Sequence, residues 1–290
     1  MEQEIIIKKS NPYLTIWRRF RKNKLAMVGL FLLLFLIAVA IGGRIFLDYD
    51  QDVVKQDIIH KLQAPSAAHI FGTDKYGRDV LARVVWGTQI SLSVGFITVV
   101  IALVAGALIG ATAGYYGGRI DNILMRVMDV FLAMPSTMLA IAVVSALGTS
   151  MANLLIALAL ARIPQFARIV RSAILSVKGM DFIEAAKACG TSDARIILKH
   201  ILPNAIGPVI VQTTTNLANT ILGVAGLSFI GLGIQPPTPE WGSMLNEAKE
   251  HMRYYPYLVI FPGLAIVIAV LAFNLIGDGL RDALDPRLKN

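Results

Sequence analysis

Residues 25–47 read LAMVGLFLLLFLIAVAIGGRIFL, an apolar run whose one charged residue, Arg44, lies near its end. A helix needs roughly 20 mostly apolar residues to cross the hydrocarbon core of a bilayer. The run is therefore long enough to span a membrane. A basic segment, 1–24, precedes it and no small-residue cleavage pattern follows it. These flanks favour a retained first span over a cleaved signal peptide.

Five further stretches have the same apolar character, and they lie at 90–113, 127–147, 151–170, 205–232 and 257–276. Continuous apolar runs favour helices over a β-barrel, whose strands alternate over about 10 residues. Hydrophobic residues make up 56% of the chain and charged residues 16%, and the mean hydropathy is +0.64. The sequence therefore predicts an all-α polytopic membrane protein with six transmembrane helices.

The formal net charge of +8 follows the predicted topology and does not indicate nucleic-acid binding. If the N-terminus is cytoplasmic, 19 of the 27 Lys and Arg residues fall in inner segments and 8 fall in outer ones. Cytoplasmic loops carry such an excess of basic residues. We therefore expect cytoplasmic tails at 1–24 and 279–290, an extracytoplasmic segment at 48–87, and a membrane core at 88–278.

The inner loop, at about 171–204, has helix signals on both sides of a glycine. Its central part reads DFIEAAKACGTSDARIILKHILPN. Alanine is a strong helix former, and Gly190 suits the left-handed residue that ends a helix. Ser192 or Asp193 can cap a second helix, and Pro203 marks the entry to the fifth span. The small side chains leave a smooth surface for a partner protein, although a solvated connector would explain the same pattern.

This loop resembles the EAA loop of bacterial ABC importer permeases. The residues that carry the resemblance are Glu184, Ala185, Ala186, Gly190, Leu202 and Pro203. In that family the loop is a coupling helix that docks into a groove of a cytoplasmic ATPase. The resemblance implies that these residues form the ATPase-coupling site of this chain.

Three more stretches resemble the dipeptide/oligopeptide subfamily of these permeases, in particular its C-type subunit. They are FGTDKYGRDVL at 71–81, GLSFIGLGIQPPTPEWG at 226–242 and GDGLRDALDPR at 277–287. The resemblance implies the transmembrane fold of type I ABC importers. The chain departs from the pattern at Gln89, where a basic residue is expected, and at 223–224, where an acidic residue is common.

The outer segments are rich in turn-forming and aromatic residues, so we predict that they form an extracytoplasmic gate or a docking surface for a binding protein. A structural plug that packs against the spans is the alternative. The residues in question are Phe71, Asp74, Arg78, Asp79, Pro236, Pro237 and Trp241.

Arg162 precedes Pro164 in the predicted fourth span, where an arginine costs roughly 2.5–3.5 kcal/mol on insertion scales. Two interpretations stay open. Arg162 lines the pore and attracts a peptide carboxylate, or its side chain snorkels to the cytoplasmic interface beside Arg168 and Arg171.

The resemblance implies that the chain is a permease subunit of an ATP-driven importer and forms half of a pore for di- or oligopeptides. It also implies a sister permease, two ATPase subunits, an extracytoplasmic substrate-binding protein and a bacterial or archaeal plasma (inner) membrane with its lipid. The chain lacks the phosphate-binding pattern G-x-x-x-x-G-K-[ST]. We therefore expect the partner ATPases to use ATP and Mg²⁺, and we expect no cofactor bound by this chain.

Two other classes of function have weaker support in the sequence. A self-contained secondary transporter or channel remains the alternative, although such carriers usually show inverted repeats and ionisable groups in mid-membrane. An intramembrane enzyme lacks support because neither G-x-S-x-G nor H-E-x-x-H occurs. One cysteine and four histidines without ligand spacing predict neither a disulfide nor a metal site, so we expect no catalytic residue and no metal.

Overall fold

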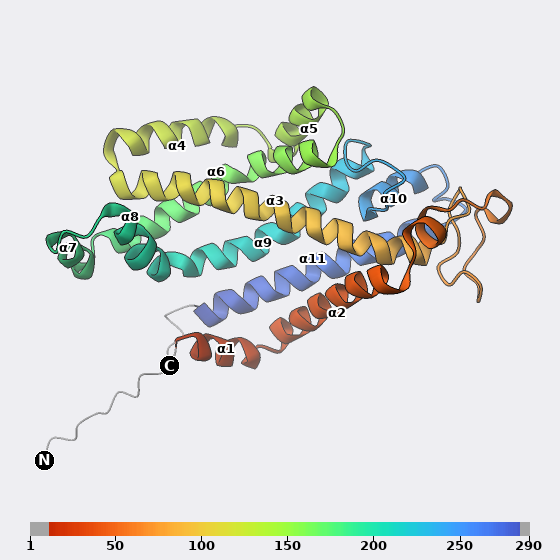
Figure 1. Ribbon diagram of the computed structural model, residues 1–290, viewed down its shortest axis with the longest axis horizontal. Coiled ribbons are helices and arrows are strands. Elements are labelled where there is room, and N and C mark those ends of the chain that lie inside the picture. Colours follow the sequence, from red (N-terminus) through yellow and green to blue (C-terminus); the bar gives the residue numbers. More distant parts are fainter. Residues whose placement is uncertain (1–11, 285–290) are drawn as a thin grey trace, which may run out of the picture.

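The computed structural model describes residues 12–284, so parts of the two expected tails, 1–11 and 285–290, lie outside the described residues. The described chain is helical and contains no β-strand; its one isolated β-bridge joins Thr73 and Asp79. Long helices lie alongside one another and run between two ends of the molecule (Figure 1). The all-helical prediction is confirmed.

Five long helices are apolar enough to cross a membrane. They are α2 (Lys24–Phe46), α3 (Val80–Tyr116), α6 (Met151–Lys178), α9 (Leu202–Phe229) and α11 (Tyr257–Leu284). At 1.5 Å per residue, the 23 residues of α2 reach about 34 Å, which suffices for a hydrocarbon core of about 30 Å. The 37 residues of α3 reach about 55 Å, so this helix extends beyond the core.

The predicted single span at 127–147 is divided in the structure. Helices α4 (Gly118–Leu132) and α5 (Ser136–Leu147) meet at a bend of 85°. Pro135 lies at the break, and a proline disfavours helical geometry in the residue before it and has no N–H to donate. The two helices together lead the chain from the end that holds α7 to the end that holds α10 (Figure 1). Counted as one broken span, they bring the total to six.

Shorter elements connect the long helices. They are α1 (Pro12–Lys22), η1 (Tyr49–Val54), η2 (Ile58–His60), α7 (Asp181–Ala188), α8 (Asp193–Arg195), η3 (Ile196–Ile201) and α10 (Trp241–Ala248). Helix α1 falls within the expected tail at 1–24, and Asn23 separates it from α2 by capping the Ala26 N–H at 3.1 Å. Helices α1, α7 and α8 gather at one end of the molecule, and α10 lies at the other (Figure 1).

Two long helices extend beyond the apolar stretches marked by the sequence. Helix α3 begins at Val80, inside the segment expected at 48–87, because the Asp79 carboxylate caps it by accepting from the Ala82 N–H at 2.9 Å. Helix α11 continues to Leu284, so the expected tail at 279–290 begins as helix. Helical hydrogen bonding extends both elements past the apolar stretch that the sequence pattern marks.

Glycines bring α3 and α6 close together. Gly106, Gly110 and Gly114 recur every four residues on α3, so they share one face of the helix. A Cβ on Gly106 would lie 2.5 Å from Cβ of Phe166, and one on Gly110 would overlap the carbonyl of Ala167. Small residues permit such close contact between membrane helices, and this pairing forms the centre of the bundle.

Candidate functional site

The inner loop forms the helix and tight turn that its sequence predicts. Helix α7 ends in a Schellman turn, in which the Thr191 N–H donates to the Ala186 carbonyl at 3.1 Å and the Gly190 N–H donates to the Lys187 carbonyl at 2.9 Å. Gly190 has a φ of +73°, in the left-handed region that favours glycine. The chain then reverses direction and enters α8.

The second half of the loop differs in detail from the prediction. Ser192 occupies the N-cap position of α8, but its side chain makes no capping hydrogen bond. Helices α8 and η3 lead directly into α9, and Pro203 lies in the first turn of α9, at the entry that the sequence predicts. The segment before Pro203 is π-helical, and the Leu202 N–H donates to the Ile197 carbonyl there. Pro203 itself has no N–H to donate.

A buried isoleucine anchors α7 to the bundle. Ile183 is fully buried and packs in one cluster with Tyr115 of α3, Ile174 of α6 and Ile196 of η3. The Tyr115 hydroxyl donates to the Asp193 carboxylate at 2.6 Å, which ties the second half of the loop to the same helix end. Helix α7 is therefore packed directly against the ends of α3 and α6.

The opposite face of α7 is open. Glu184, Ala185 and Gly190 are exposed, and Ala186 is partly buried. A Cβ on Gly190 would meet no atom within 4 Å, and the Phe182 side chain is 41% exposed beside these small residues. The loop thus exposes small side chains and one aromatic side chain on this face.

The last two residues of the sequence-derived coupling set lie apart from this surface. Leu202 is partly buried against the cluster that holds Ile183, and Pro203 is exposed at the start of α9. The structure therefore brings the first four residues of the set together and connects Leu202, but not Pro203, to them through the shared core.

At the other end of the molecule, a buried cluster of four charges ties the outer segment to α10. The Arg78 guanidinium contacts the carboxylates of Asp74 at 2.6 Å and Glu247 at 2.8 Å. Arg83 contacts Glu247 at 3.1 Å and Asp74 at 3.6 Å. The two arginines are 2% and 1% exposed, so the cluster stabilises the outer end rather than offering charges to solvent.

Trp241 is also fully buried. Its indole N–H donates to the Val84 carbonyl of α3 at 3.1 Å, and its backbone N–H donates to the Ser91 hydroxyl at 3.3 Å. The preceding residue, Glu240, caps α10 by accepting from the N–H groups of Gly242 and Ser243. In this conformation the Trp241 ring faces the protein interior and not a soluble partner.

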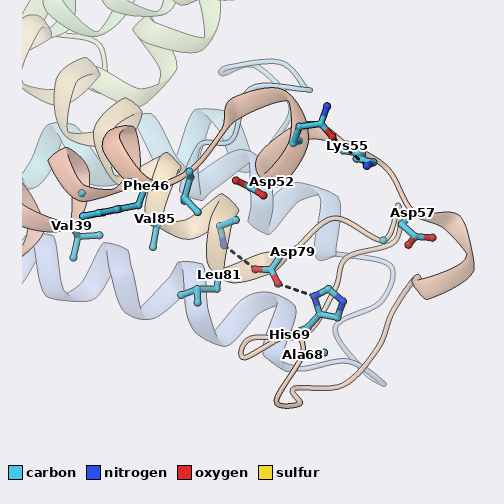
Figure 2. Close-up of a pocket in the computed structure, with 16 residues that line it drawn as sticks. Val39, Phe46, Asp52, Lys55, Asp57, Ala68, His69, Asp79, Leu81 and Val85 are labelled. Atoms are coloured by element: carbon cyan, nitrogen blue, oxygen red, sulfur yellow. Dashed lines mark hydrogen bonds and ion pairs between the residues drawn. The ribbon is translucent and has the colours of Figure 1, made fainter.

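Phe71 and Asp79 hold the outer segment against the long helices. The Phe71 ring stacks on Phe261 of α11 with centroids 3.8 Å apart. The Asp79 carboxylate lies between the start of α3 and His69, whose Nδ1 is 2.8 Å away (Figure 2). Asp79 also lines an open cavity of about 820 Å³, with apolar side chains from α2 and α3 on one side and polar ones such as Lys55 on the other (Figure 2).

Pro236 and Pro237 are exposed, in contrast to the buried members of the outer set. They lie in the connection between α9 and α10, at the same end of the molecule as the charge cluster. The Pro237 carbonyl accepts from the Arg83 guanidinium at 3.5 Å, so the exposed turn is linked to the buried arginines.

Arg162 lies within α6 and is partly buried. Its guanidinium donates to the backbone carbonyl of Asn219 in α9 at 3.3 Å. Together with Gln165 and Arg168 it lines a cavity beside the break between α4 and α5.

Arg83 and Glu247 are the residues of the outer cluster that the sequence analysis did not single out. One signal was available: Arg83 follows Arg78 at the start of an apolar span, where a charge requires a partner. The partner itself, Glu247, is 164 positions further along the chain, and no sequence pattern links the two. No group of three or more potential metal ligands occurs among residues 12–284.

The chain matches known families of transport proteins. Residues 106–290 match the family described as binding-protein-dependent transport system inner membrane component. Residues 11–65 match the N-terminal transmembrane domain of oligopeptide transport permease C. The first match alone covers more than half of the chain, so the chain belongs to this family of permeases. The resemblance drawn from the sequence motifs is confirmed.

Individual relatives are similar over almost the whole chain. The dipeptide transport system permease protein DppC of Alkalihalophilus pseudofirmus is 46% identical over 280 residues, which are 97% of this chain and 91% of that protein. The glutathione transport system permease protein GsiD of Pectobacterium atrosepticum is 46% identical over 281 residues, covering 96% and 92%. GsiD of Escherichia coli strain 536 is 48% identical over 279 residues, covering 96% and 91%.

A solved structure has the same fold. A chain of the inward-facing MetNI methionine ABC transporter superposes with a TM-score of 0.57 at 19% identity, covering 70% of this chain and 96% of that one. A second crystal form gives a TM-score of 0.58 at 20% identity, covering 71% and 97%. The fold is therefore the transmembrane fold of type I ABC importers. The chain is a multi-pass, non-catalytic permease subunit of such an importer.

Proposed function

We propose that this chain forms half of the translocation pore of an ATP-driven importer of short peptides. The relatives that span nearly the whole chain transport dipeptides and glutathione, a tripeptide, and this supports a di- or oligopeptide as the substrate. The proposed pore half is the membrane core at 88–278, together with the first turns of α3 that precede it.

The inner loop, in this proposal, couples the pore to a cytoplasmic ATPase. The observation that carries it is the two-sided character of α7. One side is exposed, and Gly190 has open space around it. The other side is anchored by the fully buried Ile183 to the ends of α3 and α6. A partner that grips the open face therefore moves the long helices and not merely a loose connection.

The complete importer contains four partner chains, and this chain has a fixed orientation in the membrane. A sister permease completes the pore, two ATPase subunits use ATP and Mg²⁺, and an extracytoplasmic binding protein delivers the peptide. The chain lies in the plasma (inner) membrane of a bacterium or archaeon, with both termini in the cytoplasm. The common location of α1, α7 and α8 at one end of the molecule supports this orientation.

We also propose that the outer segments form a gate or a docking surface for the binding protein. One part of these segments is accessible, and another part supports it. The exposed Pro236 and Pro237 and the open cavity beside Asp79 are accessible to a binding protein. Asp74, Arg78 and Trp241 are buried and Phe71 is partly buried, and their contacts support that surface from within. Trp241 supports the surface and does not form it, because a fully buried ring cannot meet a soluble partner in this conformation.

Purification of the tagged chain from its native membrane in mild detergent, with mass identification of bound proteins, tests the proposal. We expect a second permease and two ATPase chains with Walker motifs. Recovery of the chain alone, with transport intact after reconstitution without ATP, would favour a secondary carrier or channel.

A surface variant tests the coupling loop separately. We expect Phe182→Ala to retain the fold, because this side chain is 41% exposed, and to lower the amount of recovered ATPase. The matched control is Leu198→Ala on η3, a residue 64% exposed and outside the α7 surface. Equal ATPase recovery in both variants would contradict the assignment.

A further inference from the structure

Three arginines of α6 differ in how the structure neutralises them. Arg168 forms an ion pair with Asp129 at 2.6 Å. Arg171 makes two hydrogen bonds to the Asp121 carboxylate, each 2.5 Å long. Arg162 has no carboxylate partner within residues 12–284, and its one hydrogen bond there goes to the Asn219 backbone carbonyl at 3.3 Å. Intramembrane charges that lack a partner are expensive and mark functional sites.

The position of Arg162 along α6 argues against simple snorkelling. Arg162 lies nine residues before Arg171. At a rise of 1.5 Å per residue, Arg162 is therefore about 13 Å further into the span than Arg171. Its guanidinium reaches across to the backbone of α9 and not along α6 toward Arg171. The charge is therefore held between two long helices, well inside the predicted span.

A cavity of about 610 Å³ adjoins this guanidinium, where α4 breaks and α5 begins. Its polar lining includes Arg162, Gln165 and Ser136, and neither the Gln165 amide nor the Ser136 hydroxyl makes a hydrogen bond within the part of the chain that the structure describes. Apolar residues such as Phe131 and Met134 complete the lining. Three polar groups without a side-chain partner therefore line one partly apolar cavity.

We propose that this cavity is a binding site for the carboxylate of a peptide in transit. A guanidinium binds a carboxylate through two parallel hydrogen bonds, and the amide of Gln165 and the hydroxyl of Ser136 supply further donors. The apolar lining accommodates the side chain next to the carboxylate. This inference rests on the proposed function, since it names the part of the peptide that the pore recognises.

Substituted-cysteine labelling in the reconstituted complex tests the inference. The starting protein is Cys189→Ser, in which ATP-driven peptide import is measured first. Gln165→Cys is then labelled with an anionic and with a cationic methanethiosulfonate reagent of similar size. We expect the anionic reagent to react about tenfold faster than the cationic one because the Arg162 charge is close, and we expect Arg162→Gln to remove the preference.

Protection by substrate makes the test specific for a carboxylate. Alanyl-alanine at millimolar concentration should slow labelling, whereas its C-terminal amide should not. Arg162→Gln should abolish the protection and Arg162→Lys should restore part of it. Arg44→Ala serves as the control because Arg44 is exposed near the end of α2 and has no partner within residues 12–284; it should leave labelling and protection unchanged.

Two results would overturn the inference. Equal protection by the free acid and the amide would exclude carboxylate recognition. Absence of labelling by both reagents would mean that lipid or the sister subunit covers the cavity. ATP-driven import by the wild-type complex, measured beside the Cys189→Ser protein, separates these failures from a failure of the proposed function: intact wild-type import without protection rejects only this site, whereas absent import by the wild-type complex rejects the transport proposal itself.

Discussion

Gly190 and Gly148 are similar as residues but differ in where they lie. Both have a positive φ, +73° and +88°, and a Cβ on either would meet no atom within 4 Å. A side chain at either position strains the backbone, at a cost of order 1–3 kcal/mol. Gly190 follows α7, whereas Gly148 ends α5 at the opposite end of the bundle.

We expect Gly190→Trp to remain in the membrane and to lower peptide import at least tenfold, because the indole would fill the surface that the ATPase contacts. Gly148→Trp should retain import, since it also has open space and a positive φ but lies outside the inner loop. Import into proteoliposomes, normalised to the amount of assembled complex, is the measurement. Normal import by the Gly190 variant would contradict the coupling assignment.

The sequence predicts Arg78 as part of a gate or docking surface, but in the fold it is a buried residue that stabilises the outer end. It is 2% exposed and bridges Asp74 and Glu247. Removal of one partner from a buried charge cluster typically costs 3–5 kcal/mol, because the remaining charge stays buried without compensation.

Arg78→Met should therefore lower the thermal unfolding midpoint of the purified chain in detergent. Arg78→Met combined with Glu247→Met should recover part of the loss, since the pair restores neutrality. The exposed Arg253→Met should change the midpoint little. If the single and double variants unfold at the same temperature as the wild type, the cluster does not stabilise the outer end.

Among the elements, α3 and α6 depend on each other most clearly. A Cβ on Gly110 would overlap the Ala167 carbonyl, a backbone atom that cannot rotate away. Gly263 of α11 offers a contrast, because no atom lies within 4 Å of its Cβ position. Both glycines lie in apolar helices, and only their surroundings distinguish them.

Gly110→Leu should separate α3 from α6 and reduce the fraction of monodisperse protein in mild detergent, since overpacking of a core typically costs 1–3 kcal/mol even where side chains can move. Gly263→Leu should leave that fraction unchanged in the isolated chain. Size-exclusion chromatography of fluorescent fusions measures both. A monodisperse Gly110 variant at wild-type yield would show that the helices tolerate separation.

For the molecule as a whole, the native cysteine allows a direct test of orientation. Cys189 is exposed in the inner loop, and Lys55 is exposed in the outer segment. If both termini are cytoplasmic, a membrane-impermeant maleimide applied to intact spheroplasts should label Lys55→Cys and leave Cys189 unlabelled. Permeabilised membranes should show labelling of Cys189 as well. Labelling of Cys189 in intact spheroplasts would reverse the proposed orientation.

The sequence by itself determined the properties that depend on local composition. The length of the apolar stretches predicted the spans. The alanines predicted a helix, and Gly190 after them predicted the turn that ends α7. Both signals are local, because helix propensity and the left-handed preference of glycine act over a few neighbouring residues. Motif order also predicted the family, which the comparisons confirm.

Only the tertiary structure decided which charges are partnered. Glu247 reaches Arg78 and Arg83 across more than 160 residues, and Asp129 and Asp121 neutralise two arginines of α6, whereas Arg162 has no carboxylate partner among residues 12–284. It likewise turned Trp241 inward and bent the third span at Pro135. The physical reason is that pairing and burial depend on contacts between distant elements, which a local pattern of residue types does not encode.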